Sequence, residues 1–375
     1  MTTPVFYQAR AVLTPQGWRD GHGVLVAGGV IQAVLAAAPT GVSRATLPPD
    51  ALLVPGYIDI QVNGGGGVLF NDDPTAATAR HIAAAHRKLG TTGILPTLIT
   101  SPPADMSAAA ASLPAALGQG VLGLHFEGPF LSPQKPGVHR RDYLRAPDAA
   151  DLALLTTLAR VSSAPVLLTL APECVDPGAL AALAEAGVIL SAGHSAATLA
   201  QIPAAITGVT HIFNAMAPIT ARAPGLAAAG LGPALYAGVI ADLIHVHPAL
   251  LRLLAAAKPA NRIILVSDSM SVAGTDAANF TLQGRRILRR DGRLQTEDGT
   301  LAGADLSLAQ AVRNMVQLGI PPARAIAWAS TVPADFLRIG ATSGRIAPGR
   351  AADITVLTEQ LEVIGTVLGG AYAAA

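Results

Sequence analysis

The sequence is poor in cysteine and in charge. Cys174 is the only cysteine among 375 residues, which excludes an intramolecular disulfide and a cluster of thiolate metal ligands. Charged residues make up 13% of the chain and the formal net charge is +1, so nothing favours nucleic acid or a membrane as a partner. A single cysteine favours a reducing compartment, and we expect a cytoplasmic protein.

Long apolar runs and leader-like features are also lacking. No stretch offers about 18 uninterrupted apolar residues, so we expect no transmembrane helix. The N-terminal residues MTTPVFYQARAVLTPQGW do not combine a basic start with an apolar run, so we expect no signal peptide. The chain is nevertheless 51% hydrophobic, which is enough to bury a large core.

The middle of the chain alternates between apolar strand-like and Ala/Leu-rich helix-like stretches. Helical stretches are expected at 74–89, 104–118, 148–160, 177–186 and 196–206. Strands are expected at 57–63, 93–99, 121–127, 165–170, 188–193, 209–213, 236–241 and 262–268. Eight such alternations predict an α/β fold, a (β/α)8 TIM-like barrel over residues 54–340.

The two ends of the chain have a different character. Residues 1–53 and 341–375 both contain short β-rich segments separated by Gly and Asp turns. Because chain termini often lie close together, we expect one small β-sandwich domain built from both ends.

Polar side chains gather at the ends of the expected strands. In the first strand, PGYIDIQVNGGGG, the apolar side chains alternate with Asp59, Gln61 and Asn63, which therefore share one face. Further strand ends carry His125, Glu127, His194, His211, Asn214, Asp242, His245 and Asp268. In a barrel these ends meet at one rim, where active sites lie.

Three of these residues form a candidate metal site. Glu127, His194 and His211 come from three different strands. Each alone is explained more simply, as a carboxylate paired with an arginine or as a hydrogen-bonded core histidine. Together, two imidazoles and one carboxylate are a standard catalytic Zn²⁺ set with an open position for water, although Fe, Co or Mn also suit these ligands.

Other polar residues have weaker assignments. Asp268 follows the eighth strand and is either a general base beside that metal or the cap of the next helix. His125 should point the same way as Glu127, and its role stays open. We interpret His81 and His86 as exposed helix residues and His22 as part of the β domain.

Several segments resemble one family. They are PGYIDIQVNGGGG, LHFEGPFLSPQKPGVH, SAGHSAAT, THIFNAMAPI, ARAPG, VIADLIHVHP, VSDSMSVAGT and GRIAPGRAADITVL. In this order and spacing they resemble the N-acetylglucosamine-6-phosphate deacetylases, a family of the amidohydrolase superfamily, from about residue 50 to the C-terminus.

The resemblance implies an activity and roles for individual residues. The expected reaction is metal-dependent hydrolysis of N-acetyl-D-glucosamine 6-phosphate to D-glucosamine 6-phosphate and acetate. Alternatives are deacetylation of N-acetylgalactosamine 6-phosphate, deacylation of an N-acyl amino acid, or non-catalytic binding of a sugar phosphate. The implied roles are metal ligation by Glu127, His194 and His211, acid/base catalysis by Asp268, polarisation of the acetyl carbonyl by His139, sugar or phosphate contacts by Asn214 and Ala215, and phosphate binding by Arg222 and His245.

The resemblance also bears on stoichiometry and assembly. Many amidohydrolases have His-x-His where this chain has Gln61 and Asn63, and neutral amides are poor ligands for transition metals. We therefore expect one divalent metal ion per chain, Zn²⁺ before others, with these amides filling the vacated second position by hydrogen bonding. The family implies a homodimer, whose neighbouring chain can complete the phosphate pocket. We expect His247 to be structural.

Overall fold

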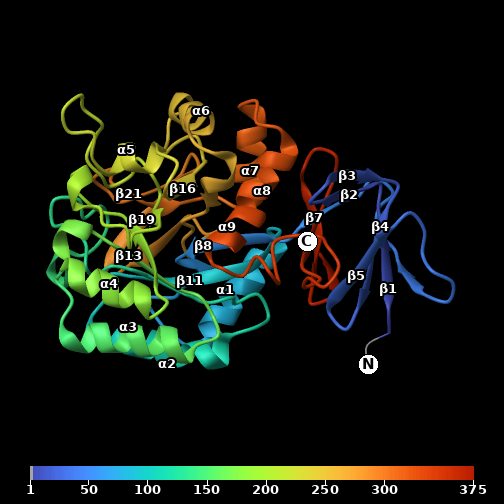
Figure 1. Cartoon of the computed structure of the whole chain (residues 1–375), viewed down its shortest axis with the longest axis horizontal. Coiled ribbons are helices and arrows are strands. Elements are labelled where there is room, and N and C mark those ends of the chain that lie inside the picture. Colours follow the sequence, from blue (N-terminus) through green and yellow to red (C-terminus); the bar gives the residue numbers. More distant parts are fainter. Residues whose placement is uncertain (1–2) are drawn as a thin grey trace.

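The computed structural model describes residues 3–375, so Met1 and Thr2 of the expected 1–53 segment lie outside the described residues. Figure 1 shows a large helix-covered barrel on the left and a smaller β-rich part on the right, which contains both chain ends. Within the described range, no helix is both long and apolar enough to cross a membrane.

Eight strands in a single parallel sheet form the barrel. They are β8 (Tyr57–Val62), β11 (Thr91–Ile99), β12 (Leu124–Glu127), β13 (Val166–Leu170), β14 (Ile189–Ala192), β15 (Gly208–Val209), β16 (Tyr236–Ile240) and β17 (Ile263–Val266). A parallel bridge between Val62 and Ser269 brings the last strand end back to the first. Each expected strand is present within a few residues of its predicted limits, and the predicted TIM-like barrel is confirmed.

Helices pack outside this sheet. They are α1 (Ala76–Lys88), α2 (Pro103–Ala116), α3 (Ala149–Val161), α4 (Pro177–Glu185), α5 (Gly225–Leu231), α6 (Pro248–Ala257), α7 (Leu308–Gln317), α8 (Pro322–Ala329) and α9 (Thr331–Phe336). The helix expected at 196–206 is wrong, because only a 3₁₀ turn, Leu199–Gln201, forms there. Pro203 has no N–H to continue it, and Gln201 Oε1 accepts the Thr198 N–H at 2.9 Å.

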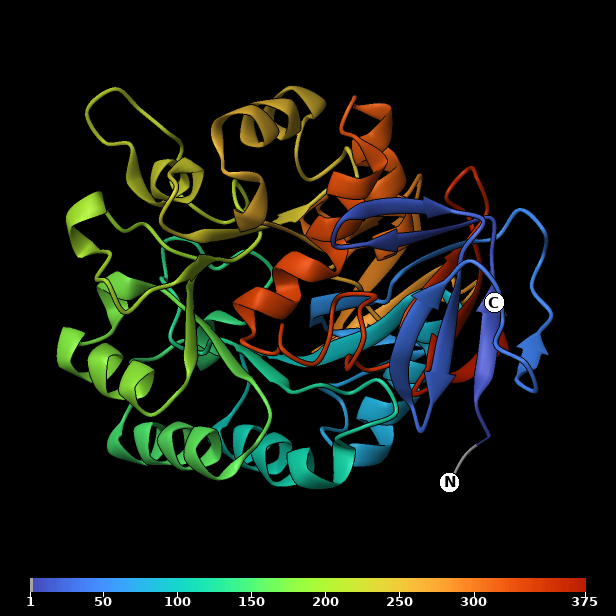
Figure 2. The ribbon, with the colours of Figure 1, turned by 45° about the vertical axis from the view of Figure 1, so that its right-hand side comes forward.

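Strands from both ends of the chain lie side by side next to the barrel (Figure 2). One sheet contains β1 (Val5–Gln8), β4 (Gly23–Ala27), β5 (Val30–Leu35) and β6 (Ser43–Ala45). The other contains β2 (Ala11–Thr14), β3 (Gly17–Asp20), β7 (Leu52–Pro55), β22 (Ile354–Leu357), β23 (Val363–Leu368) and β24 (Ala371–Ala374). Apolar side chains from both sheets, among them Val12, Ile31 and Ile354, form a separate core. The exact domain limits stay predictions.

A second small sheet interrupts the barrel between β17 and α7, which the sequence analysis did not anticipate. Its strands are β18 (Asn279–Leu282), β19 (Arg285–Arg290), β20 (Arg293–Gln295) and β21 (Leu301–Ala304), in that order. Leu282, Ile287 and Leu294 are buried against the loops at the barrel mouth, including Met270 and Val138. This sheet and the short pair β9 (Gly64–Gly65) and β10 (Val68–Leu69) flank the strand ends.

Candidate active site

The polar strand ends surround one cavity of about 290 Å³. It lies at the carboxyl ends of the barrel strands, where barrels of this kind place their active sites. The predicted site residues that line it are Asn63, Glu127, His139, His194, His211, Asn214, Ala215, His245 and Asp268. The side chains predicted to meet at the barrel rim therefore form one continuous wall of the cavity.

Three ligand-type atoms converge on the floor of this cavity. Glu127 Oε1 lies 2.9 Å from His211 Nε2 and 3.4 Å from His194 Nε2, and the two imidazole nitrogens are 3.1 Å apart. His194 Nδ1 donates to the Lys135 carbonyl at 2.9 Å, so a neutral His194 directs the Nε2 lone pair at the carboxylate. Because two acceptors face each other there, the arrangement needs a proton or a cation between them.

The spacing of these atoms fits a divalent ion. Ligands bound tetrahedrally at about 2.0–2.1 Å lie roughly 3.4 Å apart, close to the separations of these three atoms. Glu127, His139 and His194 also offer ligand atoms within 4.8 Å of one another. His139 Nε2 is 4.0 Å from Glu127 Oε2, however, so the triangle with His211 fits better.

Backbone strain is concentrated at the same place. His194, His211 and Asp268 have φ angles of 48°, 30° and 49°, in the left-handed region that residues other than glycine rarely adopt. The predicted location of His211 inside a strand is wrong, because β15 ends at Val209. These turns direct the three side chains into the cavity instead of along the barrel wall.

The amides of the first strand donate hydrogen bonds to carboxylates. Gln61 Nε2 donates to Glu127 Oε1 at 3.0 Å and to Asp268 Oδ1 at 3.3 Å. Asn63 Nδ2 donates to Asp268 Oδ1 at 2.7 Å. Asp59 lies deeper and does not line the cavity; its carboxylate accepts the N–H of Gln61 at 3.2 Å and that of Ser267 at 3.2 Å.

Burial and neighbouring charges shift the pKa values of these groups. Burial and the charge of Glu127 raise the pKa of Asp268 to about 6. Burial acts to raise the pKa of Glu127 too, but the neighbouring imidazoles of His194 and His211 hold that pKa well below its usual value. Burial and the neighbouring His194 hold the pKa of His139 well below the ordinary value, so this ring is neutral at physiological pH.

His139 is oriented by a threonine that the sequence analysis missed. Its Nδ1 lies 2.7 Å from the Thr100 hydroxyl, at the end of β11. The small sheet also contributes Thr300, Leu301 and Gly303 to the cavity wall. Two-residue turns rich in glycine, at 283–284 and 291–292, were the sequence signal for that sheet.

Two histidines differ from simple expectations. His125 Nδ1 lies 3.1 Å from the Thr97 hydroxyl and its Nε2 lies 2.8 Å from that of Thr169. It therefore belongs to a polar layer below the candidate metal ligands, and burial lowers its pKa to about 4. The prediction that His86 is exposed is wrong, because the side chain is buried and its Nε2 contacts the Gly64 carbonyl at 3.0 Å.

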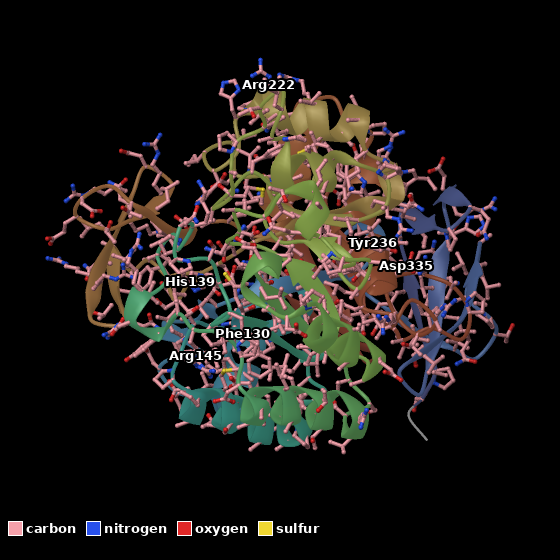
Figure 3. All side chains as sticks on the ribbon, turned by 60° about the vertical axis from the view of Figure 1, so that its left-hand side comes forward. Phe130, His139, Arg145, Arg222, Tyr236 and Asp335 are labelled. Carbon is pink, nitrogen blue, oxygen red and sulfur yellow. The ribbon has the colours of Figure 1, made fainter. Side chains whose placement is uncertain are left out.

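The residues assigned to phosphate are not all at the cavity. His245 lines it, and its Nδ1 donates to Asp242 Oδ2 at 2.6 Å. Arg222 is exposed and does not line it, and Figure 3 shows Arg222 at the periphery, far from His139. His247 Nδ1 accepts the Ala249 N–H at 3.2 Å and caps α6. One chain thus brings His245, but not Arg222, to the candidate site.

Comparisons with known proteins agree with this geometry. A model of the Amidohydrolase family matches residues 52–372. An N-acetylgalactosamine-6-phosphate deacetylase of Shewanella sp. (strain ANA-3) is 38% identical, over 85% of this chain and 82% of that protein. An N-acetylglucosamine-6-phosphate deacetylase of Haemophilus influenzae is 34% identical, over 93% of this chain and 94% of that protein.

Solved structures give the same result. The crystal structure of N-acetylglucosamine-6-phosphate deacetylase from Pasteurella multocida superposes with a TM-score of 0.93 at 33% identity. The match covers 99% of this chain and 100% of that one. The resemblance that the sequence motifs indicated is confirmed, and the chain belongs to the amidohydrolase family.

Proposed function

We propose that this protein hydrolyses N-acetyl-D-glucosamine 6-phosphate to D-glucosamine 6-phosphate and acetate, using one bound divalent metal ion. The convergence of Glu127, His194 and His211 beside the buried carboxylate of Asp268 carries this proposal. The names of the relatives that match most of the chain support it.

Glu127, His194 and His211 would hold the metal ion. A divalent ion bound there supplies a Lewis acid for the acetyl carbonyl and lowers the pKa of a water molecule to roughly 7. The set of two imidazoles and one carboxylate favours zinc. Lys135 supports this assignment, because its carbonyl accepts the Nδ1 proton of His194 and so leaves Nε2 free to ligate.

Asp268 is the proposed general base and acid. Its carboxylate takes the proton of the attacking water and then delivers that proton to the departing amine nitrogen. The hydrogen bond from Asn63 at 2.7 Å fixes the carboxylate on one oxygen and favours its ionised form. The other oxygen stays available to the reacting water.

His139 is the proposed partner of the acetyl oxygen. When the Thr100 hydroxyl donates to Nδ1 at 2.7 Å, the neutral ring carries its proton on Nε2, which faces the cavity. A preorganised donor of this kind stabilises a developing oxyanion by about 3 kcal/mol.

The sugar and its phosphate are assigned to the part of the cavity wall formed by His245, Asn214 and Ala215. Arg222 would join them only from a neighbouring chain, so this assignment includes a homodimer. Cross-linking or light scattering tests the dimer, and an Arg222→Ala variant with an unchanged KM would contradict the phosphate role.

Gln61 and Asn63 support a single metal ion. Their amide groups donate to Glu127 and Asp268, so these carboxylates already have partners on that side. The amide nitrogens carry protons and cannot ligate a cation, and the remaining amide oxygens are neutral, weak ligands for a transition metal. A metal titration that finds two tightly bound ions per chain would refute this part of the proposal.

N-acetylgalactosamine 6-phosphate is the second candidate substrate. The 38% identical Shewanella relative carries the galactosamine name, whereas the Haemophilus relative carries the glucosamine name. The two sugars differ only in the configuration of one hydroxyl. The ratio of kcat/KM for the two phosphates separates the candidates.

One sample can test the reaction and the metal together. Metal-loaded protein should release acetate from N-acetylglucosamine 6-phosphate and contain close to one zinc ion per chain. Removing the 6-phosphate should lower kcat/KM strongly. No acetate from either phosphate would sink the proposal. We also infer a cytoplasmic location from the single cysteine, which cell fractionation tests.

A further inference from the structure

The four glycines at 64–67 pack between helix α1 and the segment that follows Asp268. The Gly64 N–H donates to the Ser269 carbonyl at 3.2 Å, and the neighbouring Asn63 N–H donates to the same carbonyl at 3.0 Å. Two further N–H groups of this glycine loop donate to the carbonyls two and four residues beyond Ser269, each at 2.8 Å. The loop therefore fastens the end of the first barrel strand to the segment that carries Asp268.

One imidazole from α1 contacts both parts of this junction. His86 Nε2 lies 3.0 Å from the Gly64 carbonyl oxygen and 3.2 Å from the Ser269 hydroxyl. Gly64 directly follows Asn63 in the chain. Ser269 directly follows Asp268, whose Oδ1 accepts the Asn63 side-chain N–H at 2.7 Å. His86 is thus one residue removed, on each side, from the hydrogen bond that fixes the proposed base.

His86 is a hydrogen-bond donor at this position. Burial lowers the pKa of its ring, so the imidazole is neutral at physiological pH and carries one N–H. Because a carbonyl oxygen only accepts, that proton lies on Nε2 and is donated to Gly64. The Ser269 hydroxyl, at 3.4 Å from the same carbonyl, completes a triangle that joins the two chain segments.

Gly65 makes room for this ring. A Cβ built on Gly65 would lie 2.9 Å from both Cδ2 and Nε2 of His86, which is closer than real Cβ atoms approach. Gly65 is not among the glycines with a positive φ, so space and not backbone freedom requires a glycine here. The close approach of the imidazole therefore explains this part of the glycine run.

The backbone of Asp268 needs support of this kind. Its φ of 49° is rare for residues other than glycine, and such a conformation persists only where the surroundings hold it. On one side, the Asp268 N–H donates to the Gln61 carbonyl at 3.1 Å, and the Asp268 carbonyl accepts the Ala304 N–H at 2.8 Å. The contact between His86 and Ser269 holds the next residue along the chain.

We propose that His86 is a positioning residue for the hydrolysis. By holding Gly64 and Ser269 together, it keeps the Asp268 carboxylate aligned for proton transfer. This inference rests on the proposed function, because it takes Asp268 as the general base. His86 does not line the cavity, so it acts through the backbone and not on the substrate. A misplacement of about 1 Å at a reacting group lowers a rate by up to about 100-fold, so a residue outside the cavity can control turnover.

The first test is His86→Leu, which removes the N–H and keeps a side chain of similar volume. With N-acetylglucosamine 6-phosphate, kcat should fall about tenfold and KM should change by less than about twofold. The metal content should stay near one ion per chain, since His86 is not a proposed ligand. His86→Gln should restore most of kcat, because the amide nitrogen lies as many bonds from Cα as Nε2 does and also donates.

The matched control is His81→Leu. His81 lies on the same helix, and its Nε2 lies 2.9 Å from the carbonyl oxygen of Gly66 in the same glycine loop. This contact is exposed and two residues farther from Asn63 than the contact of His86. The same chemical change at this position should leave both kcat and KM unchanged.

The Asp268→Asn background separates positioning from folding. Once the base is removed there is nothing to align, so adding His86→Leu should lower the residual kcat by less than about twofold. A general folding defect would lower kcat by the same factor in both backgrounds. If His86→Leu does not fold, Ser269→Ala tests the same link by the loss of one hydroxyl, and kcat should fall about threefold with KM unchanged.

Several outcomes would overturn the inference. They are a His86→Leu protein with wild-type kcat, a loss that glutamine does not restore, and a loss that persists in full in the Asp268→Asn background. An unaffected Ser269→Ala protein would do the same if His86→Leu does not fold. In each case wild-type activity would leave the proposed function standing. A wild-type protein that releases no acetate would remove the proposed function itself.

Discussion

The two sides of the barrel mouth stabilise carboxylates in different ways. On the side of β14 and β15, the Glu127 carboxylate faces imidazole nitrogens that come within 3.4 Å. On the side of β8, Gln61 and Asn63 direct N–H groups at Glu127 and Asp268. The histidine side therefore needs a cation between its acceptor atoms, whereas the amide side already supplies hydrogen-bond donors to the carboxylates. The comparison teaches that residue type on one strand can decide how many metal ions a barrel mouth holds.

Removing an imidazole from the metal side should have the largest effect. In His194→Ala, one of three ligands is lost, so we expect the metal content to fall from one per chain to near zero after dialysis. Acetate release should fall to background, and a chelator should have the same effect on the wild-type protein. Elemental analysis and an acetate assay measure both.

The matched control for that change is His247→Ala. This histidine caps α6 and lies outside the cavity lining, so metal and activity should remain. A His194→Ala protein that retains stoichiometric metal would show that the two sides do not differ as described.

Replacing the base should have the next largest effect. Asp268→Asn keeps the shape of the side chain but cannot accept a proton, so kcat should fall by about 10²–10⁴-fold. The metal content should stay near one per chain, since Asp268 is not one of the three proposed ligands. If the variant lost its metal together with its activity, Asp268 would instead be a metal ligand.

Weakening the amide side should have a smaller, pH-dependent effect. The bond from Asn63 lowers the pKa of Asp268, so Asn63→Ala should raise that pKa. A base works only when ionised, so activity is lost as pH falls through its pKa. The acidic limb of the kcat/KM profile should therefore move up by about one pH unit. A limb that stays in place or moves down would contradict the role given to this amide.

Asp59 should affect stability more than activity. Burial raises its pKa to about 7, so the folded state favours the neutral carboxyl. Its contribution to the free energy of unfolding is then present below about pH 4 and is lost as pH rises through about 7. Relative to Asp59→Asn, the metal-free wild-type protein should lose about 4 kcal/mol between pH 4 and 8.

Urea unfolding of both proteins across this pH range measures the difference. A difference that does not change with pH would show that Asp59 is already ionised in the folded state. The three polar groups of the first strand would then be alike. The proposal instead has two that face the site and one that helps to close the barrel.

The barrel and its polar rim could be predicted because the alternation of apolar and polar residues along the strands matches the fold. Ile58, Ile60 and Val62 alternate with polar residues, and every strand end meets the same rim. The small sheet was missed although its Asp291-Gly292 turn is a typical hairpin signal, since a helix is expected after the eighth barrel strand.

Other errors arise from contacts that no local pattern encodes. His86 has the charged neighbours Arg87 and Lys88, but it lies four residues after the buried Ile82 on the inner side of α1. That spacing was the missed signal. The position of Arg222 depends on the conformation of the loop that carries it. Its proposed role in phosphate binding depends on a second chain.

The left-handed backbone at His194, His211 and Asp268 has a consequence for protein engineering. Each such residue costs of order 1–3 kcal/mol, which glycine would largely avoid. Libraries selected only for heat resistance should therefore enrich glycine at these three positions and discard the chemistry while improving the scaffold. A thermostable variant of this enzyme has to be sought under selection for turnover, with these positions held constant.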